Sequence, residues 1–318
     1  MVYLVLFFLF VIIQLVYFKI ANKFNIIDKP NNRSSHTEIT LRGGGIIFPV
    51  SLCVAYFLGE VSVQLTIAVL MVGVVSFIDD IKPLNVFPRF LAHFAAIFLV
   101  IYELNLFSQE IWIVSIVVIL MIGWVNAFNF MDGINGITVL YALTSIISFS
   151  LLSVNGKNLP LLIIVGLSCF AFGIFNVRKK AKTFAGDVGS ISMAVFLSYF
   201  MIKTVLETNQ FGYLLFFSIY GIDTVVTILY RIKKKENILK PHRSHLYQYL
   251  VNEYGYPHLL IAFSYAGIQL LINLIVIYCE KNGGLNIYLC ILFLVILMAV
   301  YLLIRKLILK NLTSKNVK

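Results

Sequence analysis

Charged residues are scarce in this chain. They make up only 12% of its 318 residues, whereas 60% of the residues are hydrophobic. A soluble domain of this length carries about 25% charged residues. The shortage of charge therefore argues against a soluble globular protein, because so much apolar surface needs lipid as its solvent. We expect a single integral-membrane domain that covers residues 1–318.

Cysteine is also rare, and no basic residue stands ahead of the first apolar run. The chain has four cysteines, none in a CxxC pair and none near clustered histidines, so we interpret them as small packing residues rather than zinc ligands. A cleaved secretory signal begins with positive charge, whereas here Lys19 and Lys23 follow the apolar run. We therefore expect a retained first span with the N-terminus outside.

Long apolar runs are what the sequence does contain. About 20 apolar residues cross the hydrocarbon core of a bilayer as a helix. The chain has eleven candidate spans: 2–20, 44–59, 62–78, 90–107, 111–129, 136–154, 159–176, 189–206, 211–230, 258–279 and 286–304. These runs predict an all-α, polytopic transmembrane bundle, in which the short, Gly-rich second span is the weakest.

The distribution of positive charge orients this bundle. With the N-terminus outside, the inner segments together with Lys19 hold 22 of the 25 Lys and Arg residues. This agrees with the positive-inside rule and puts the C-terminus in the cytoplasm. The formal net charge of +11 then reflects orientation and attraction to anionic membrane lipids, and we expect no nucleic-acid partner.

Aspartate is confined to one side of the predicted bundle. All six Asp residues lie in inner segments or in the inner half of a span, whereas five of the eight Glu lie toward the outside. A purely solubilising role does not sort the two residue types in this way. Short carboxylates at the ends of several helices are typical of a site for a hard cation.

Two motifs put polar side chains where a span reaches the inner face. Asp79 and Asp80 end the third span, where adjacent carboxylates repel one another unless cations, a metal ion or a shared proton neutralise them. Asn129, Asp132 and Asn135 end the fifth span at a spacing of three, which predicts one shared side of a helical turn. A solvated helix end and an Asx-rich turn are the alternatives.

Glycines and basic residues mark three further inner segments. Asp187 lies between Gly186 and Gly189 at the start of the eighth span, which suits a phosphate–metal complex or a plain N-cap. The longest inner loop contains the sequence His242-Arg-Ser-His245, whose three basic side chains suit a diphosphate, with a metal-binding His pair or a plain loop as alternatives. The first inner loop ends in Arg42-Gly-Gly-Gly45, which could cradle phosphate or permit tight helix packing.

Two further candidate side chains lie inside a predicted span or at its edge. Asp223 is a site candidate by default, although an internal partner such as Arg231 or a hydroxyl of Thr224 or Thr227 explains it equally well. Arg89 begins the fourth span, where it would meet a lipid phosphate or extend to the interface.

Together these motifs resemble a known superfamily in residue types and order. The chain is similar to the polyprenyl-phosphate N-acetylhexosamine-1-phosphate transferases of glycosyltransferase family 4, the group that holds the MraY and WecA enzymes. The resemblance covers residues 28–250 and is carried by Arg33-Ser-Ser-His36 with Arg42-Gly-Gly-Gly45, Phe77-Ile-Asp-Asp80, Asn129-Phe-Met-Asp-Gly-Ile-Asn-Gly136, Gly186-Asp187-Val-Gly189-Ser190 and Pro241-His-Arg-Ser-His245. The last segment resembles the bacterial O-antigen-initiating branch more than the peptidoglycan branch, which has a run of histidines there.

The resemblance implies a reaction and its partners. A UDP-N-acetylhexosamine and a polyprenyl phosphate, undecaprenyl phosphate in bacteria, would give polyprenyl-diphospho-N-acetylhexosamine and UMP, which starts O-antigen, capsule or another cell-envelope polysaccharide. We expect the enzyme in the cytoplasmic membrane with its active site on the cytoplasmic face, and a homodimer is a further expectation. Asn135 replaces an acid that the family often has, and Lys82 stands one residue closer to the Asp pair than the Lys of the peptidoglycan branch.

The resemblance also implies roles for individual residues. Mg²⁺, with Mn²⁺ as an alternative, would be held by Asp187 together with Asn129 or Asp132, and Asn135 would hold uridine. Asp79 or Asp80 would position or deprotonate the lipid phosphate. The remaining assigned side chains would act on the phosphates or bind the substrates, and they are His242, His245 and Arg243 in the long loop, and Arg42, His36 and Arg89 elsewhere.

Three other classes of membrane protein are alternatives. A secondary transporter would place its acids near the bilayer midplane within inverted repeats, and the sequence has no evident repeat. Transferases that act on prenyl diphosphates or CDP-alcohols resemble Asp-rich patterns of another spacing. A structural scaffold would not need inner-face aspartates.

Overall fold

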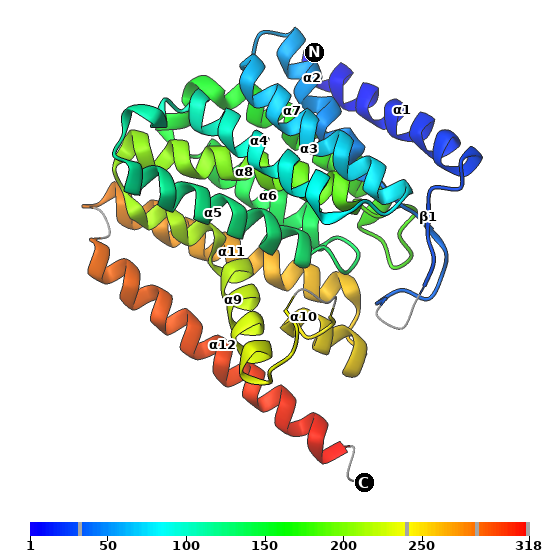
Figure 1. Ribbon diagram of the computed structural model, residues 1–318, viewed down its shortest axis with the longest axis vertical. Helices are drawn as coiled ribbons and strands as arrows, with labels where there is room; N and C mark the ends of the chain where they lie inside the picture. The colour runs from blue at the N-terminus through cyan, green and yellow to red at the C-terminus, as the bar shows by residue number, and fades with distance from the viewer. Residues whose placement is uncertain (31–33, 239–241, 284–285, 316–318) are drawn as a thin grey trace.

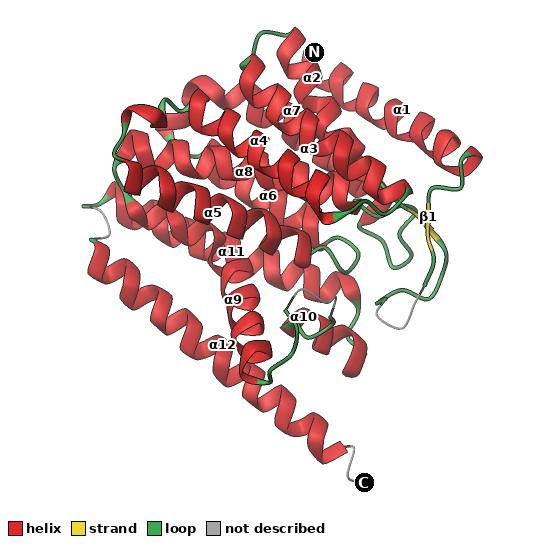
Figure 2. Ribbon diagram, viewed as in Figure 1, coloured by secondary structure: helices red, strands yellow, loops and turns green. Residues whose placement is uncertain are grey.

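The computed structural model describes residues 1–30, 34–238, 242–283 and 286–315, and helices dominate it (Figures 1 and 2). The helices are α1 (Val2–Lys23), α2 (Ile47–Phe57), α3 (Val63–Ile81), α4 (Val86–Glu103), α5 (Ile111–Phe130), α6 (Ile137–Ser150), α7 (Leu159–Asn176), α8 (Gly186–Thr208), α9 (Ser218–Lys233), α10 (Leu246–Gln248), α11 (His258–Lys281) and α12 (Ile287–Lys315). Shorter helices are η1 (Gly44–Ile46), η2 (Leu106–Ser108), η3 (Ser153–Asn158), η4 (Phe211–Phe217) and the π-helix η5 (Tyr249–Glu253).

Each predicted span overlaps one of these helices, and the expectation of an all-α membrane bundle is confirmed. In the described part of the chain, nine helices are long and apolar enough to cross a bilayer, counting η3 with α7 and η4 with α9. The second and sixth predicted spans correspond to shorter apolar helices, Gly44–Phe57 and Ile137–Ser150. The count of eleven spans and the orientation of the termini therefore stay predictions.

Helix α8 forms the centre of the bundle and is the most buried of these spans. It packs against α3 and α5, while α1, α2 and α7 lie on one side and α6 and α11 on another (Figure 1). Small residues permit the closest approach, because a Cβ atom at Gly189 of α8 would lie 2.8 Å from the Cα atom of Gly45. Gly45 in η1 thus lets the first inner loop touch the start of α8.

A short antiparallel sheet and several backbone hydrogen bonds fix this loop. Strand β1 (Ile27–Asp28) pairs with β2 (Thr40–Leu41). Backbone N–H groups then join the loop to the segment before α8: Phe184 donates to Leu41 (2.8 Å), Gly44 to Phe184 (2.9 Å) and Gly45 to Ala185 (3.0 Å). The result is that two segments 140 residues apart in sequence form one wall near the N-terminus of α8.

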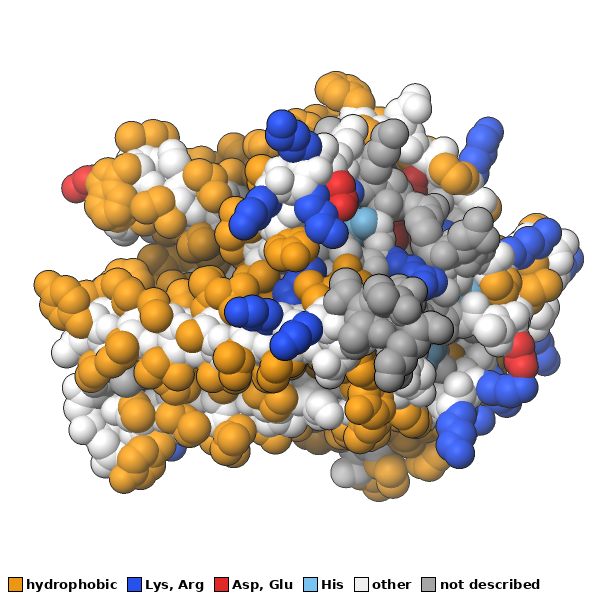
Figure 3. Space-filling model, turned by 90° about the horizontal axis from the view of Figure 1, so that it is seen from below, with side chains coloured by type: hydrophobic (Ala, Val, Ile, Leu, Met, Phe, Trp, Pro, Cys, Tyr) orange, Lys and Arg blue, Asp and Glu red, His pale blue; other side chains and the backbone are white. Residues whose placement is uncertain are grey.

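Two helices depart from the common direction of the bundle. The 3₁₀ helix η4 leads into α9, which is steeply inclined to its neighbours, and α12 diverges from the bundle toward its C-terminal end (Figure 1). In Figure 3, most of the visible Lys and Arg side chains lie in the middle and right of the view, whereas the left end is mainly apolar. The positive-inside rule expects Lys and Arg to gather toward one end of a membrane bundle, and which end faces the cytoplasm stays a prediction.

Candidate active site

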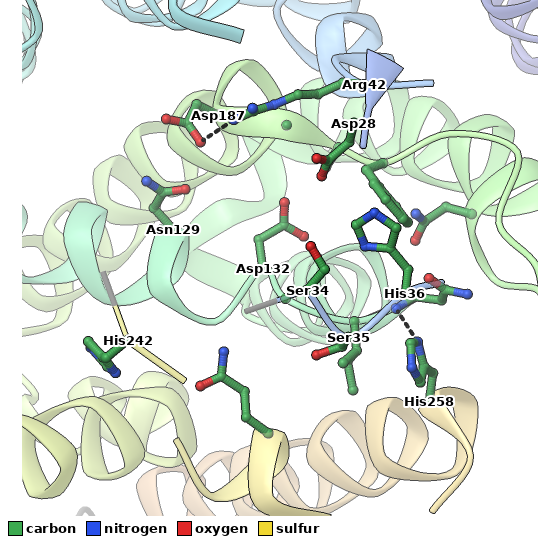
Figure 4. Close-up of a pocket in the computed structure, with 18 residues that line it drawn as sticks. Asp28, Ser34, Ser35, His36, Arg42, Asn129, Asp132, Asp187, His242 and His258 are labelled. Atoms are coloured by element: carbon green, nitrogen blue, oxygen red, sulfur yellow. Dashed lines mark hydrogen bonds and ion pairs between the residues drawn. The ribbon is translucent and has the colours of Figure 1, made fainter. Parts of the chain in front are cut away.

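A cavity of about 470 Å³ lies among the loops at one end of the bundle (Figure 4). Its walls come from the first inner loop, the end of α5 with the turn that follows, the start of α8, the 242–248 segment and the start of α11. Seven of the side chains singled out by the sequence motifs line it: His36, Arg42, Asn129, Asp132, Asn135, Asp187 and His242. The structure therefore brings together segments that the sequence only placed on the same predicted face.

Asp80 is committed to the first turn of α8. Its carboxylate accepts hydrogen bonds from the backbone N–H groups of Asp187 (3.0 Å) and Val188 (3.1 Å), and it pairs with Nε of Arg42 at 2.7 Å. The side chain is fully buried and does not line the cavity. A carboxylate on the unpaired N–H groups of a helix start stabilises that end of the helix, so Asp80 fixes the position of Asp187.

Gly186 leaves room for the carboxylate of Asp80 to approach the backbone at the start of α8. It adopts a φ of +71°, and a Cβ atom there would collide with the carboxylate of Asp80. The glycine that precedes Asp187 is thus required by the turn and by the close approach of Asp80.

Asp187 itself lies between two guanidinium groups. Arg42 is 3.6 Å from one carboxylate oxygen and Arg89 is 3.4 Å from the other (Figure 4 shows the Arg42 contact). Arg89 also pairs with Asp79 at 3.3 Å, and Asp79 accepts the backbone N–H of Leu84 at 2.6 Å. The acids and bases alternate, which neutralises charges that would otherwise repel one another in this partly buried region.

The electrostatics of Arg42 follow from these neighbours. Burial lowers the pKa of Arg42, but the carboxylates of Asp80, Asp187 and Asp28 outweigh that effect and raise its pKa above the usual value. Arg42 is therefore a permanent positive charge in the cavity wall, as an anionic ligand requires.

Asn129 and Asp132 present oxygen atoms opposite Asp187 (Figure 4). The hydroxyl of Ser190 donates to Oδ1 of Asn129 at 2.8 Å, and the hydroxyl of Thr138 donates to Asp132. Burial raises the pKa of Asp132 to about 7, against the effect of the Thr138 hydrogen bond, and the negative charge of Asp187 adds to the increase. Asp132 is therefore poised to gain or lose a proton near neutral pH.

Asn135 reaches the cavity by a different geometry from the one predicted. Helix α5 ends at Phe130, so Asn129, Asp132 and Asn135 do not share a helical face. The amide nitrogen of Asn135 donates to the carbonyl groups of Arg178 (2.9 Å) and Lys179 (3.1 Å). The backbone N–H of Asn135 donates to Nδ1 of His258 at 3.4 Å. Asn135 thus joins the turn after α5 to the loop after α7 and to the start of α11.

The three basic side chains of the long inner loop separate instead of converging. His242 lines the cavity, and its Nδ1 lies 3.0 Å from the hydroxyl of Ser244. Arg243 pairs with Glu253 at 2.7 Å. His245 is buried outside the cavity, with Nδ1 3.0 Å from Asp223. The expected shared grip of all three side chains on one diphosphate is not the geometry of this loop, because Asp223 and Glu253 hold two of them elsewhere.

His242 also differs from the expected basic residue in its charge. Burial, together with the neighbouring His245 and Arg231, lowers the pKa of His242 to about 4. A neutral imidazole can exchange hydrogen bonds with a ligand but brings no positive charge to it.

Several cavity residues were not anticipated from the sequence. They are Asp28 of β1, Asn176 at the end of α7, Gln248 of α10 and His258 at the start of α11. Ser34 and Ser35 also line the cavity; they belong to the motif Arg33-Ser-Ser-His36 but had no predicted role. Asn176 accepts the backbone N–H of Gly136 (2.8 Å) and donates to the carbonyl of Thr183 (2.9 Å), so it ties two loops together. The motif residues Arg33 and Pro241 lie outside the described residues.

Asp223 has hydrogen-bonding partners inside the protein. It accepts hydrogen bonds from the hydroxyl groups of Thr227 (3.3 Å) and Tyr265 (2.6 Å). The contact with Thr227 is one of the internal partners that the sequence suggested. Arg231 pairs instead with Glu236 at 3.1 Å.

The cavity contains carboxylate and amide oxygens, which are the donor types that hard cations such as Mg²⁺ and Mn²⁺ prefer. Within the described residues, no group of three or more His, Cys, Asp and Glu side chains is arranged to hold a metal ion. Mg²⁺ usually takes only one or two protein carboxylates and completes its shell with water and substrate phosphate oxygens. Asp187 and Asp132, with the amide oxygen of Asn129, supply such a donor set, and soft ligands are absent from the described cavity lining.

Comparisons with known proteins bear on the family that the sequence resembles. Residues 62–205, which contain Asp79, Asp132 and Asp187, match the family described as "Glycosyl transferase family 4". The chain is 24% identical to the "Probable undecaprenyl-phosphate N-acetylglucosaminyl 1-phosphate transferase" of Bacillus subtilis, over 76% of this chain and 73% of that protein.

Relatives from other bacteria are named for a related activity. The "Phospho-N-acetylmuramoyl-pentapeptide-transferase" of Fervidobacterium nodosum is 24% identical over 61% of this chain and 68% of that protein. The protein of the same name from Thermotoga maritima is 26% identical over 61% of this chain and 69% of that protein. The predicted resemblance to the polyprenyl-phosphate N-acetylhexosamine-1-phosphate transferase superfamily is thus confirmed.

Proposed function

We propose that the protein transfers an N-acetylhexosamine-1-phosphate from a UDP-sugar to a polyprenyl phosphate and releases UMP. The observation that carries this proposal is the cavity, which collects the carboxylates of Asp132 and Asp187, the amide of Asn129 and the guanidinium of Arg42 from distant segments. Two phosphorylated reactants repel each other, so their approach requires positive charge and a polar enclosure. The Bacillus subtilis relative, which is named as a probable undecaprenyl-phosphate N-acetylglucosaminyl 1-phosphate transferase, supports the same reaction.

The donor diphosphate would occupy the region between Asp187, Asn129 and Arg42. When Mg²⁺ is bound by these oxygen donors, it supplies charge neutralisation to the diphosphate oxygens. Arg42 adds fixed positive charge, and neutral His242 exchanges a hydrogen bond with a phosphate oxygen. Asn135 and the adjacent backbone hold uridine in this proposal, at the end of the cavity where His36 and His258 lie (Figure 4).

The acceptor phosphate would attack the β-phosphorus of the UDP-sugar. A new P–O bond forms from the lipid phosphate oxygen, while the bond to the α-phosphate oxygen breaks and its electron pair leaves with UMP. A phosphate monoester loses its second proton near pH 6, so the lipid phosphate is mostly ionised at neutral pH without a strong base. This favours a positioning role for Asp79 and Asp80 over proton abstraction, in keeping with their pairing to Arg89 and Arg42.

We propose direct displacement, and a covalent phosphoryl intermediate on Asp187 is the alternative. The two arginine contacts and the helix N-terminus favour Asp187 as a fixed anion rather than a free nucleophile. Trapping of a labelled phospho-aspartate at this position would refute direct displacement.

The setting of the reaction is also a proposal. The bias of Lys and Arg toward the loops supports a cytoplasmic active site in the cytoplasmic membrane, where nucleotide sugars are available. The lipid-linked sugar would then start O-antigen, capsule or another cell-envelope polysaccharide, and the type of sugar would be decided by donor binding.

Transfer of phosphate label is the direct test. Purified protein is incubated with a UDP-sugar labelled with ³²P at the β-phosphate, polyprenyl phosphate and Mg²⁺, and the organic phase and UMP are measured. We expect label in the lipid phase in proportion to UMP. The Asp187→Asn variant should reduce the rate by at least about 100-fold, because it removes a carboxylate that would hold Mg²⁺ at the diphosphate site.

Controls separate this reaction from the alternatives. Omission of polyprenyl phosphate must abolish the label, and a panel of UDP-sugars identifies the preferred donor. Absence of transfer with every UDP-sugar would overturn the proposal. Uptake of substrate into sealed vesicles without transfer would favour the secondary transporter instead.

A further inference from the structure

Helix α12 contains a buried arginine in an otherwise mostly exposed span. Leu303 and Leu307 are 62% and 54% exposed, whereas Arg305 between them is 3% exposed. An arginine within a span is costly unless it has polar partners inside the protein. The partners of Arg305 therefore indicate what this helix is fixed to.

The partners of Arg305 belong to α9, to the 242–249 segment or to α12 itself. The guanidinium donates to the carbonyl of Ser244 (2.8 Å), the hydroxyl of Thr227 (3.1 Å) and the hydroxyl of Tyr301 (3.0 Å). It also lies over the rings of Tyr230 (5.3 Å) and Tyr249 (5.6 Å). The direct hydrogen bond to Ser244 attaches α12 to the loop that carries His242.

Two hydroxyl groups connect Arg305 to a buried carboxylate. Thr227 and Tyr301 each accept a hydrogen bond from Arg305 and each donate one to Asp223, at 3.3 and 3.0 Å. The same carboxylate lies 3.0 Å from Nδ1 of His245 and accepts the backbone N–H of Leu246 at 3.2 Å. The positive Arg305 and the carboxylate of Asp223 are thus joined through the hydroxyl groups of Thr227 and Tyr301. Each of the two charged groups also contacts the loop, Arg305 at Ser244 and Asp223 at His245.

The held residues adjoin the cavity wall. Ser244, whose carbonyl Arg305 holds, contacts Nδ1 of His242 through its hydroxyl at 3.0 Å. Gln248 accepts the backbone N–H of His245 at 3.1 Å, and both His242 and Gln248 line the cavity. A shift of Ser244 or His245 must therefore move two groups that face the substrate.

We propose that Arg305 and Tyr301 of α12 are positioning residues that hold the His242–Gln248 segment against the active-site cavity. This inference rests on the proposed transferase activity. It gives the C-terminal helix a role in the reaction even though neither residue lines the cavity.

Variants of α12 test the proposal in the full-length enzyme with the labelled UDP-sugar assay. We expect Arg305→Met to lower kcat by at least about tenfold, because small displacements of substrate-facing groups are costly, while the KM for polyprenyl phosphate stays nearly constant. Arg305→Lys should recover part of the rate, since it keeps the charge and one donor. Lys306→Met is the matched control, because Lys306 is exposed on the same turn, and it should match the unaltered enzyme.

A double-mutant cycle separates positioning from general destabilisation. If Arg305 acts through His242, Arg305→Met should lower kcat much less in a His242→Gln background than in the unaltered enzyme. Equal losses in both backgrounds, or full activity of Arg305→Met, would overturn the proposal. Tyr301→Phe provides the same comparison if Arg305→Met does not fold, because it removes only the hydroxyl. Failure of the unaltered enzyme to transfer label would instead refute the proposed function and this inference with it.

Discussion

Asp132 combines a functional position with a cost to stability. Its carboxyl group lines the cavity, and burial raises its pKa from 3.8 to about 7. Because the folded protein holds the proton more tightly than the unfolded chain, this group favours folding at low pH. That contribution is lost as the pH rises from about 4 through about 7 and is gone above that range.

The Asp132→Asn variant should therefore become the more stable protein as the pH rises, when no divalent ion is present. An asparagine keeps an acceptor for Thr138 but never ionises. Since the side chain is only partly shielded from the cavity, we expect a gain of about 2 kcal/mol at pH 8, well below the full pKa difference, and almost none at pH 4. Thermal unfolding in detergent at several pH values measures this, and a pH-independent difference would contradict it.

Asp80 shows why a motif identifies a region more surely than a role. The adjacent carboxylates of Asp79 and Asp80 predict a binding or catalytic pair. Both lie close to Asp187, because Asp80 accepts its backbone N–H and Asp79 shares Arg89 with it. The carboxylate oxygens of Asp80 nevertheless contact Arg42 and two backbone N–H groups of α8. Those partners are more than 30 residues away along the chain, so no local pattern could reveal them.

At the scale of the helices, the junction between η4 and α9 needs outside support. A 3₁₀ segment that meets an α-helix leaves backbone groups without their usual partners, and inside a membrane each one needs another. Gln269 of α11 supplies them, since it donates to the carbonyl of Leu215 at 2.9 Å and accepts the N–H of Ile219 at 2.9 Å. It also accepts the hydroxyl of Tyr141 at 2.7 Å and is fully buried.

Replacement of Gln269 by Leu should destabilise the protein by about 2–4 kcal/mol, because it leaves several buried polar groups unpaired. The rate of transfer should fall as well, since α9 carries Asp223. Asn126→Leu is the matched control. Asn126 is exposed, and its amide donates to the carbonyl of Ile122 in its own helix at 2.8 Å, so its loss should change stability by less than about 0.5 kcal/mol. Equal melting temperatures for the two variants would refute the supporting role of Gln269.

Helices were predictable from the sequence, and their connections were not. Long apolar runs fix the spans because each is a local property, and every predicted span overlaps a helix. The last helix extends beyond the predicted span, which ends at residue 304, because α12 continues to Lys315 through polar residues without a helix breaker. Likewise, the distribution of His242, Arg243 and His245 depends on Asp223 and Glu253, which only the folded chain brings near.

For the molecule as a whole, the position of the cavity at one end of the bundle decides which loops must lie on the opposite side of the membrane. Asp187 begins α8 beside the cavity, and Thr204 lies near the other end of the same helix, about 25 Å away at 1.5 Å per residue. Asn155 of η3 donates to Thr204 at 3.3 Å, so η3 and its exposed Lys157 lie at the end of the bundle opposite the cavity. If the cavity faces the cytoplasm, Lys157 must face outward.

Cysteine labelling in intact cells tests this orientation. In a variant without the four native cysteines, which are all unpaired, a cysteine replaces either Lys157 or Lys180. A membrane-impermeant maleimide should label Lys157→Cys from outside, whereas Lys180→Cys, whose side chain is 77% exposed near the cavity-side loops, should react only after permeabilisation. The reverse pattern would put the cavity outside the cell, away from nucleotide sugars. The positive charge around that cavity would then violate the rule by which short, basic loops stay on the cytoplasmic side.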